Sequence, residues 1–326
     1  MSRRSQSHLD AVDGILLFDK EVGFSSNSAL QQVKRLFNAR KAGHTGSLDP
    51  LASGLLPVCF GQATKLSQYL LDSDKRYLTT FKLGETTTTG DAEGDVIAQQ
   101  MVDISEQQLQ NTLNNFSGVI EQVPPMYSAL KKDGQPLYKL ARQGIEIERK
   151  PRVVEILDIT VVNFDGKRVE LVVHCSKGFY IRSLAFDLGQ ALGCGAHVAQ
   201  LRRIAVGKFS IENAVNFAEL EAMDNQQRLQ QLLPVDAGID EMPFVCLSEE
   251  ASYYFCQGQE VRTADNAKAG LVRVYLDEDV FLGIGEAQPG RRVKPKRLLN
   301  TNSCLLYTSP SPRDQRPNLV CRLLLE

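Results

Sequence analysis

The sequence has no apolar run of about 18 residues, the length that a transmembrane helix needs, so no membrane-spanning helix is expected. The first ten residues are polar and contain no apolar stretch typical of a secretory signal, so we expect a cytoplasmic location. The seven cysteines form no CxxC pair and the four histidines are scattered, which argues against a zinc site. Cys59 and Cys175 lie in apolar segments and are expected to be reduced core residues.

A strong excess of charge is also missing, since 37 basic and 39 acidic residues give a formal net charge of −2. A dedicated nucleic-acid binder is often strongly basic, so this sum argues weakly against one. The charges are unevenly distributed, however. Residues 131–152 carry seven basic side chains, residues 291–297 carry five basic side chains and no acid, and residues 212–250 carry nine acids and one arginine. This division suits a protein with one phosphate-facing surface, although a mixed solvated surface is the simpler alternative.

One loop combines a carboxylate, Asp49, with many small and turn-forming residues. Gly43, Gly46 and Gly54 can adopt a positive φ or admit a close backbone approach. Pro50 fixes its own φ and biases Asp49 away from helical conformations. Catalytic groups tend to lie in such loops on a rigid scaffold, whereas a plain Asp-Pro turn is the alternative interpretation.

The residue order GHTGSLDPLASG (43–54) resembles the signature loop of the TruB family of tRNA pseudouridine synthases. The resemblance runs from about residue 13 to about residue 299. Four further motifs carry it, in order: KLSQYL (65–70), DKRY (74–77), PMYSALK (125–131) and SKGFYIR (176–182). Five separated motifs in sequence are far more specific than any one of them.

The resemblance implies an RNA-modifying isomerase that converts the T-loop uridine of tRNA (position 55 in tRNA nomenclature) to pseudouridine. In this reaction the N1–C1′ bond breaks, the uracil turns while bound, and C5 bonds to C1′, so neither a metal nor a cofactor is needed. The expected partner is the T-arm stem-loop of tRNA, bound by a monomer with no obligate protein partner. An extruded base is expected, because the reacting atoms cannot be reached within a stack.

The motifs assign roles to individual residues by resemblance. Asp49 is the candidate carboxylate, and whether it attacks C1′ or takes a sugar proton stays open. Arg182 is its expected partner, because a guanidinium orients a carboxylate and keeps it ionised. Tyr77 matches the tyrosine that stacks on the target base and helps to remove the C5 proton. Each of these three has an ordinary structural alternative when taken alone.

Further residues match positions around the base and the RNA backbone. Tyr180 and Leu201 match base-pocket positions, and His44 matches a residue that helps to flip or hold the uridine. Lys20 and Lys65 are candidate phosphate or scaffold contacts, although Glu21 stands where the family is expected to have proline. Candidate contacts to the RNA backbone are Lys131, Lys132 and Arg142.

The resemblance, together with the apolar segments, implies an α+β fold of the pseudouridine synthase type, with a mixed, largely antiparallel central sheet flanked by helices. A length of 326 residues allows one large domain or two. The acidic segment 85–106 is expected to be an exposed loop or hairpin. Strands are expected over 14–20, 55–60, 76–83, 153–164, 169–175, 201–209, 261–262, 271–275 and 281–285. Helices are expected over about 26–37 (capped by Ser25 or Ser26), 63–71, 105–116, 137–142, 180–192 and 222–233.

The predicted domains follow from these elements and from the resemblance. A flexible segment 1–10 precedes a catalytic domain over 11–240, which contains an RNA-clamping insertion at about 122–151. A small β-rich, PUA-like RNA-binding domain is expected over 244–302. Residues 303–326 resemble translated sequencing adapter and are interpreted as a non-native tail, with a disordered extension as the alternative.

Two other functions are compatible with parts of the sequence. The first is a non-catalytic protein that binds or folds tRNA on the same scaffold, against which the intact set of Asp49, Tyr77 and Arg182 argues. The second is a carboxylate-dependent glycosidase or hydrolase. Most glycosidases need two carboxylates, and only one acid here lies in a matching motif.

Overall fold

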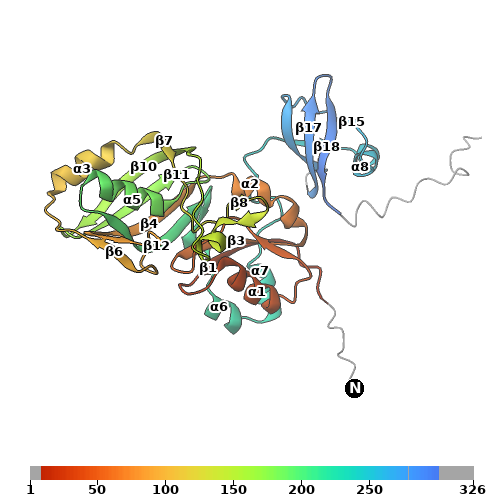
Figure 1. Cartoon of the computed structure of the whole chain (residues 1–326). Coiled ribbons are helices and arrows are strands. Elements are labelled where there is room, and N and C mark those ends of the chain that lie inside the picture. Colours follow the sequence, from red (N-terminus) through yellow and green to blue (C-terminus); the bar gives the residue numbers. More distant parts are fainter. Residues whose placement is uncertain (1–8, 278, 301–326) are drawn as a thin grey trace, which may run out of the picture. The chain divides into compact units, whose positions relative to one another are not determined.

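The computed structural model describes residues 9–277 and 279–300, which form two compact units divided between Gly238 and Ile239 (Figure 1). The predictions for residues 1–8 and for the tail 303–326 lie outside the described residues. Each unit has its own sheet and core, so each is described by itself. No helix in the described part of the chain combines the length and the apolar character that crossing a membrane requires.

The first unit is built on a nine-stranded sheet. Its main path runs β1 (Gly14–Lys20), β3 (Ser53–Phe60), β12 (Ala196–Val206), β4 (Lys75–Leu83), β11 (Arg168–Cys175), β10 (Arg152–Phe164) and β7 (Gly118–Gln122). β2 (Ala42–His44) pairs with β3, and β13 (Phe209–Ser210) pairs with β12. Only β3 and β12 run parallel, and the other pairs are antiparallel. The prediction of a mixed, largely antiparallel sheet is therefore confirmed.

Helices cover this sheet in two places (Figure 1). α3 (Glu106–Asn114) and α5 (Ile181–Ala191) pack on β4, β10, β11 and β12 and form one buried apolar cluster. α1 (Ser26–Leu36) and α6 (Phe217–Ala222) pack on β1 and β3 and form a second cluster. Tyr77 and Leu201 contact both clusters, so they mark the junction of the two halves of the unit.

The apolar run of β1 is buried on both faces of its strand. Leu16 and Phe18 face the cluster under α1, whereas Ile15 and Leu17 pack into a further cluster together with Cys59. This explains why the segment is continuously apolar rather than alternating. Cys59 and Cys175 are buried free thiols, as predicted, and burial raises the pKa of each to about 12.

Local capping explains where several helices begin. Ser25 is the N-cap of α1, and Ser105 with Gln108 forms the predicted capping box of α3. The helix predicted over 63–71 is instead two short pieces, η1 (Gly61–Lys65) and α2 (Ser67–Leu71). The surface helix predicted near 222–233 is present as the shorter α7 (Asn225–Gln230), because Asp224 caps a new start after α6 ends at Ala222.

The acidic segment after β4 forms the expected hairpin, with β5 (Glu85–Thr87) pairing with β6 (Val96–Gln99). The expectation that it is exposed is wrong in one respect. Thr87 and Asp91 are buried, because the turn between the strands folds back onto β12 and Asp91 bridges to Val198. The predicted insertion holds the short hairpin of β8 (Lys131–Lys132) and β9 (Gln135–Pro136), followed by α4 (Leu137–Ala141).

The second unit is β-rich, as predicted. Its five-stranded sheet has the order β14 (Phe244–Leu247), β16 (Gly270–Leu276), β17 (Val280–Gln288), β18 (Arg292–Leu298) and β15 (Val261–Arg262). α8 (Glu249–Cys256) packs Phe255 into its core, next to Val245 and Val272. Neither α8 nor β18 is predicted from the sequence. In β18, exposed basic residues outnumber the single buried valine, Val293, so the segment shows no apolar strand pattern.

Candidate active site

Asp49 lies in the loop between β2 and β3, where the backbone is tightly constrained. A turn closes on it, since the amide of Ala52 donates to the Asp49 carbonyl at 3.0 Å. Gly54, at the start of β3, has φ +103°, and a Cβ there would lie 2.3 Å from the Arg203 carbonyl oxygen. Only glycine fits this position, which lets the loop leave the sheet directly beside β12.

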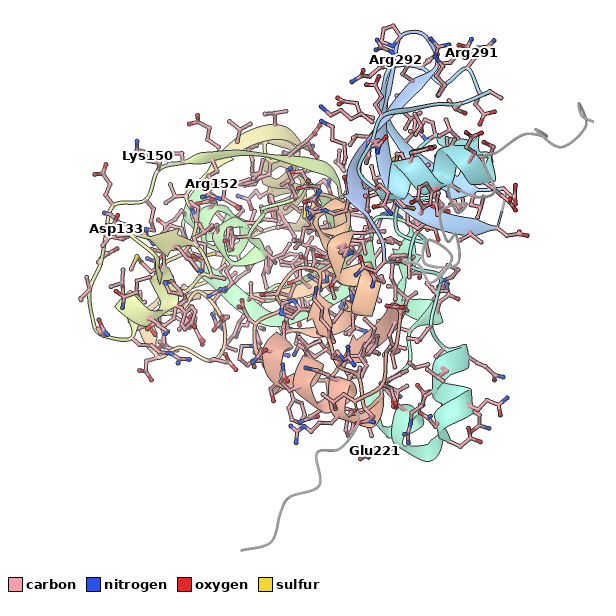
Figure 2. The ribbon with its side chains drawn as sticks, turned by 90° about the vertical axis from the view of Figure 1, so that its right-hand side faces the viewer. Asp133, Lys150, Arg152, Glu221, Arg291 and Arg292 are labelled. Carbon is pink, nitrogen blue, oxygen red and sulfur yellow. The ribbon has the colours of Figure 1, made fainter. Side chains whose placement is uncertain are left out.

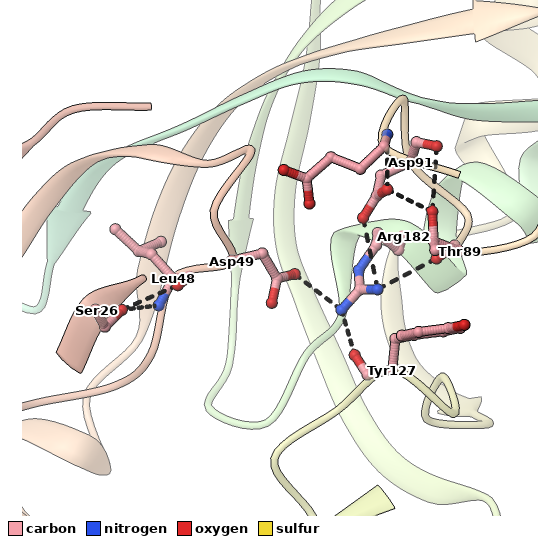
Figure 3. A network of polar contacts seen from close by, with 8 residues as sticks. Ser26, Leu48, Asp49, Thr89, Asp91, Tyr127 and Arg182 are labelled. Atoms are coloured by element: carbon pink, nitrogen blue, oxygen red, sulfur yellow. Dashed lines mark hydrogen bonds and ion pairs between the residues drawn. The ribbon is translucent and has the colours of Figure 1, made fainter. Parts of the chain in front are cut away.

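Arg182 lies in the first turn of α5 and carries the central ion pair of the site (Figure 3). Its Nη2 is 2.8 Å from Asp49 Oδ2 and donates to the Tyr127 carbonyl at 2.5 Å. Its Nη1 donates to the Thr89 carbonyl at 3.2 Å. The Arg182 side chain is only 7% exposed, whereas that of Asp49 is 43% exposed. A buried cation thus holds a carboxylate that remains open on its other side.

Asp91 is a second acid on the same guanidinium, and sequence reasoning missed it. Its Oδ2 lies 3.6 Å from Arg182 Nη1, and its side chain is 4% exposed. The Thr89 hydroxyl and the Glu93 amide both donate to the other carboxylate oxygen, Oδ1. One acid among several in an acidic hairpin carries no distinguishing sequence signal, so only the fold reveals it.

The pKa of Asp49 is raised above its ordinary value, chiefly because burial disfavours the charged form. The nearby charge of Asp91 adds to this rise, whereas Arg182 and Lys20 oppose it. The arginine therefore limits the rise without reversing it. A cavity of about 550 Å³ borders Arg182, Thr89 and Tyr127, and Asp49 is not among its lining residues.

Tyr77 lies in β4, opposite Arg203 of β12, and its hydroxyl accepts a hydrogen bond from the Arg203 guanidinium. Arg203 is 1% exposed, and it also donates from Nε to the Leu55 carbonyl at 2.7 Å and from Nη2 to the Gly46 carbonyl at 3.1 Å. Burial raises the pKa of Tyr77, so the phenol stays protonated at neutral pH. Arg203 thus connects the tyrosine to both ends of the Asp49 loop.

Arg203 was also missed from the sequence, although Arg202-Arg203 directly follows Leu201. Neighbouring residues of a strand point to opposite faces. Arg202 is partly exposed and pairs with Asp19 at 2.6 Å, while Arg203 enters the interior. Two adjacent arginines in a strand thus indicate that one of them points into the interior. Which one does so is known only once the burial of each face is known.

His44 and Lys20 lie close to this network. Nδ1 of His44 is enclosed and has no hydrogen-bond partner in the described residues, and burial followed by the charge of Arg203 lowers the pKa of the imidazole. Lys20 is 0% exposed, and its Nζ donates to the carbonyls of Glu21 at 2.8 Å and Phe24 at 2.7 Å. Burial lowers the pKa of Lys20 to about 8. These two bonds tie the Lys20 ammonium to the backbone that follows β1.

Tyr180 and Leu201 are held by two different elements. Tyr180 is the N-cap residue of α5, and Gln122 bonds to its backbone amide at 2.8 Å and to its carbonyl at 3.1 Å. Leu201 lies in β12 opposite Thr79 and contacts both core clusters. Asp49, Arg182, Tyr77 and Leu201 are therefore all anchored to elements that meet at this junction.

The basic candidates lie apart from the ion-pair network. Lys65 is half-buried at the end of η1, whereas Lys131, Lys132 and Arg142 are exposed on the insertion. The Arg142 guanidinium lies 5.7 Å from the ring centroid of Tyr138. Figure 2 shows exposed Lys150 and Arg152 where the insertion returns to β10.

Metal ligands are not gathered anywhere in residues 9–277 and 279–300. No group of three or more histidine, cysteine or acidic side chains there is placed to hold a metal ion.

Comparisons with known families cover nearly all of the described chain. Residues 34–181 match the TruB family pseudouridylate synthase N-terminal domain, and residues 182–240 match the tRNA pseudouridylate synthase B C-terminal domain. Residues 243–299 match the pseudouridine synthase II TruB C-terminal domain. The first two ranges together hold every residue of the ion-pair network.

Curated proteins of high similarity carry the same family name. The chain is 52% identical over 288 residues to tRNA pseudouridine synthase B of Methylobacillus flagellatus, covering 88% of this chain and 95% of that protein. It is 53% identical over 294 residues to tRNA pseudouridine synthase B of Stutzerimonas stutzeri, covering 89% and 96%.

Solved structures show the same fold. One is a crystal structure of a Cbf5–Nop10–Gar1 complex, with a TM-score of 0.67 and 25% identity over 87% of this chain and 84% of that chain. An H/ACA ribonucleoprotein bound to a substrate RNA containing 2′-deoxyuridine also gives a TM-score of 0.67, at 21% identity over 93% and 95% of the two chains. The motifs, the three matched domains and the identity over most of the chain agree, and this chain belongs to the TruB family of pseudouridine synthases.

Proposed function

We propose that this chain is a tRNA pseudouridine synthase that converts the T-loop uridine at position 55 to pseudouridine, with Asp49 as the reacting carboxylate. The observation that carries the proposal is the ion pair of Asp49 with buried Arg182 at 2.8 Å, made by a carboxylate that stays 43% exposed. The names of the similar proteins support the substrate class. The chain acts as a monomer in the cytoplasm on the T-arm stem-loop, without an obligate protein partner.

The reaction is an isomerisation, so no atom is gained or lost. The N1–C1′ bond of the extruded uridine breaks, the uracil turns and C5 bonds to C1′. C5 then loses its proton and N1 gains one, so the product has the same atoms as the substrate. Asp49 acts at the sugar, either by attack on C1′ or by removal of a sugar proton. Arg182 holds one carboxylate oxygen of Asp49 through a charge-assisted contact at 2.8 Å, which favours the ionised form of the acid.

The side chains around Asp49 suit an extruded base. Tyr77 offers an aromatic face for stacking, and Leu201 and Tyr180 supply the walls of the base pocket. His44 holds the uridine close to the loop, and its lowered pKa favours the neutral imidazole. Lys131, Lys132 and Arg142, on the exposed insertion, contact the RNA backbone.

The test is mass mapping of tRNA from a synthase-deficient strain supplied with residues 1–302. The parent chain restores pseudouridine at the T-loop position, and Asp49→Asn abolishes it while tRNA binding is retained. Asp95→Asn, an exposed acid of the nearby hairpin, is the matched control and restores pseudouridine like the parent. Pseudouridine formed by Asp49→Asn rules out the proposed carboxylate. Binding by the parent without product favours a non-catalytic tRNA-binding protein, and release of free uracil favours a hydrolase.

A further inference from the structure

The segment between β1 and α1, together with Ser26, forms hydrogen bonds to the Asp49 loop on both sides of the acid. The hydroxyl of Ser26 accepts from the Leu48 amide at 2.6 Å and lies 2.9 Å from the Leu48 carbonyl, to which it donates (Figure 3). The amide of Gly23 donates to the Pro50 carbonyl at 2.8 Å. Leu48 and Pro50 are the two neighbours of Asp49 in the chain, so the backbone is held immediately before and after it.

The two bonds of Ser26 are enclosed. Ser26 is 4% exposed, and Leu48 is buried in the cluster under α1. Water cannot replace these bonds, so removal of the hydroxyl leaves a buried amide and a buried carbonyl without partners. The hydroxyl is also not needed to cap the helix, because Ser25 accepts from the Ser28 amide at 3.1 Å and fills that role. Two adjacent serines thus have separate tasks.

Lys20 stabilises the segment between β1 and α1 (residues 21–25). Its ammonium donates to the carbonyls of Glu21 and Phe24, which lie on either side of Gly23. These two bonds fix the turn that carries the Gly23 amide toward Pro50. The chain from Lys20 to Ser26 therefore forms one hydrogen-bonded support under the Asp49 loop.

From these contacts we propose that Ser26 is a positioning residue, which holds the Asp49 backbone so that the carboxylate faces Arg182 and the substrate sugar. The inference rests on the proposed role of Asp49. An aspartate side chain that is 43% exposed has room to rotate, and the single contact with Arg182 Nη2 does not by itself define its direction. Bonds to the backbone on both sides fix the direction of the Asp49 Cα–Cβ bond before the reaction, which limits the positions that its carboxylate can reach.

The test compares Ser26→Ala with Ser25→Ala, at a temperature where both variants are fully folded. Ser26→Ala lowers kcat on tRNA on the order of 10- to 100-fold with KM within about threefold of the parent, because it displaces the acid and leaves RNA binding intact. Ser25→Ala loses a helix cap but keeps the parent kcat. Ser26→Cys, which keeps a weak donor and acceptor, gives an intermediate kcat.

Hydrogen exchange at the Leu48 amide supplies a readout that does not depend on catalysis. Ser26→Ala speeds exchange at Leu48 while the core amides of β3 keep the parent rates. Parent kcat in Ser26→Ala, or an equal fall in Ser25→Ala, overturns the inference. If Asp49→Asn stays active while exchange at Leu48 still rises in Ser26→Ala, the support exists but the proposed role of Asp49 is wrong, and the inference is overturned with it.

Discussion

Asp91 lies 3.6 Å from Arg182, against the terminal nitrogen opposite to the one that contacts Asp49. One guanidinium therefore bridges two acids that come from different loops, the β2–β3 loop and the turn between β5 and β6. Asp91 is itself fixed by the Thr89 hydroxyl and the Glu93 amide. This arrangement makes Asp91 the fixed end of the network and Asp49 the open end.

Replacing Asp91 tests whether the fixed end matters for the reaction. Asp91→Asn keeps the shape but removes the charge that anchors Arg182, so we expect kcat to fall on the order of 10-fold with little change in KM. Single-turnover rates with excess enzyme measure the effect. Asp95→Asn, in the same hairpin but exposed, serves as the control. A parent rate in Asp91→Asn contradicts the anchoring role.

The pH dependence of the rate follows from the raised pKa of Asp49. If the reaction needs the ionised carboxylate, the rate falls as the pH decreases through that pKa, above the usual carboxyl value of 3.8. Burial is the largest cause of the rise, and the charge of Asp91 is one further contribution. The acidic limb of the profile therefore shifts to lower pH in Asp91→Asn. If the acidic limb stays in place or moves to higher pH in Asp91→Asn, the limb reports a group other than Asp49.

The same pKa has a consequence for stability. A carboxyl whose pKa is higher in the folded than in the unfolded state binds its proton more tightly when folded. Stability then decreases as the pH rises from the unfolded value through the folded value, and ionised Asp49 destabilises the fold at neutral pH. Asp49→Asn should therefore unfold at the same temperature as the parent or higher at neutral pH, with the difference shrinking in acid. A lower unfolding temperature at neutral pH contradicts this reasoning.

The sequence predicts the parts of the site that lie in motifs, and it misses those defined only by burial. The pairing of Asp49 with Arg182 follows from two motifs more than a hundred residues apart, because the resemblance supplies the contact. Asp91 and Arg203 look like ordinary acidic and basic residues until the fold encloses them. Each of them completes the surroundings of a residue that the sequence did identify.

The fold shows the same division between local and distant information. Capping residues such as Ser105 act within a few positions, so α3 was predicted correctly. β18 was missed because its exposed basic residues outnumber its buried Val293, and only its pairing with β17 and β15 defines it as a strand. Local signals thus locate helix starts, whereas strand identity depends on partners that are distant in sequence.

Arg203 offers a stability prediction with a control one residue away. Arg203→Lys cannot reach the carbonyls of Leu55 and Gly46 together with the Tyr77 hydroxyl, so buried acceptors lose their partners. We expect the free energy of unfolding to fall by about 1–3 kcal/mol. Arg202→Lys, which affects a partly exposed ion pair with Asp19, should cost less than about 1 kcal/mol. Urea denaturation measures both, and equal losses refute the special role of the buried guanidinium.

The insertion gives a prediction about RNA binding rather than catalysis. Lys131 and Lys132 lie exposed in a short hairpin, and changing both to glutamine removes the two phosphate contacts proposed for them. We expect weaker tRNA binding and a slope of log affinity against log salt that is less negative by about one to two, with kcat at saturating tRNA unchanged. Lys167→Gln, in the exposed turn between β10 and β11, is the control for loss of a single charge. Filter binding at several salt concentrations decides the matter. If the double variant keeps the parent slope, the hairpin lysines do not contact the RNA backbone.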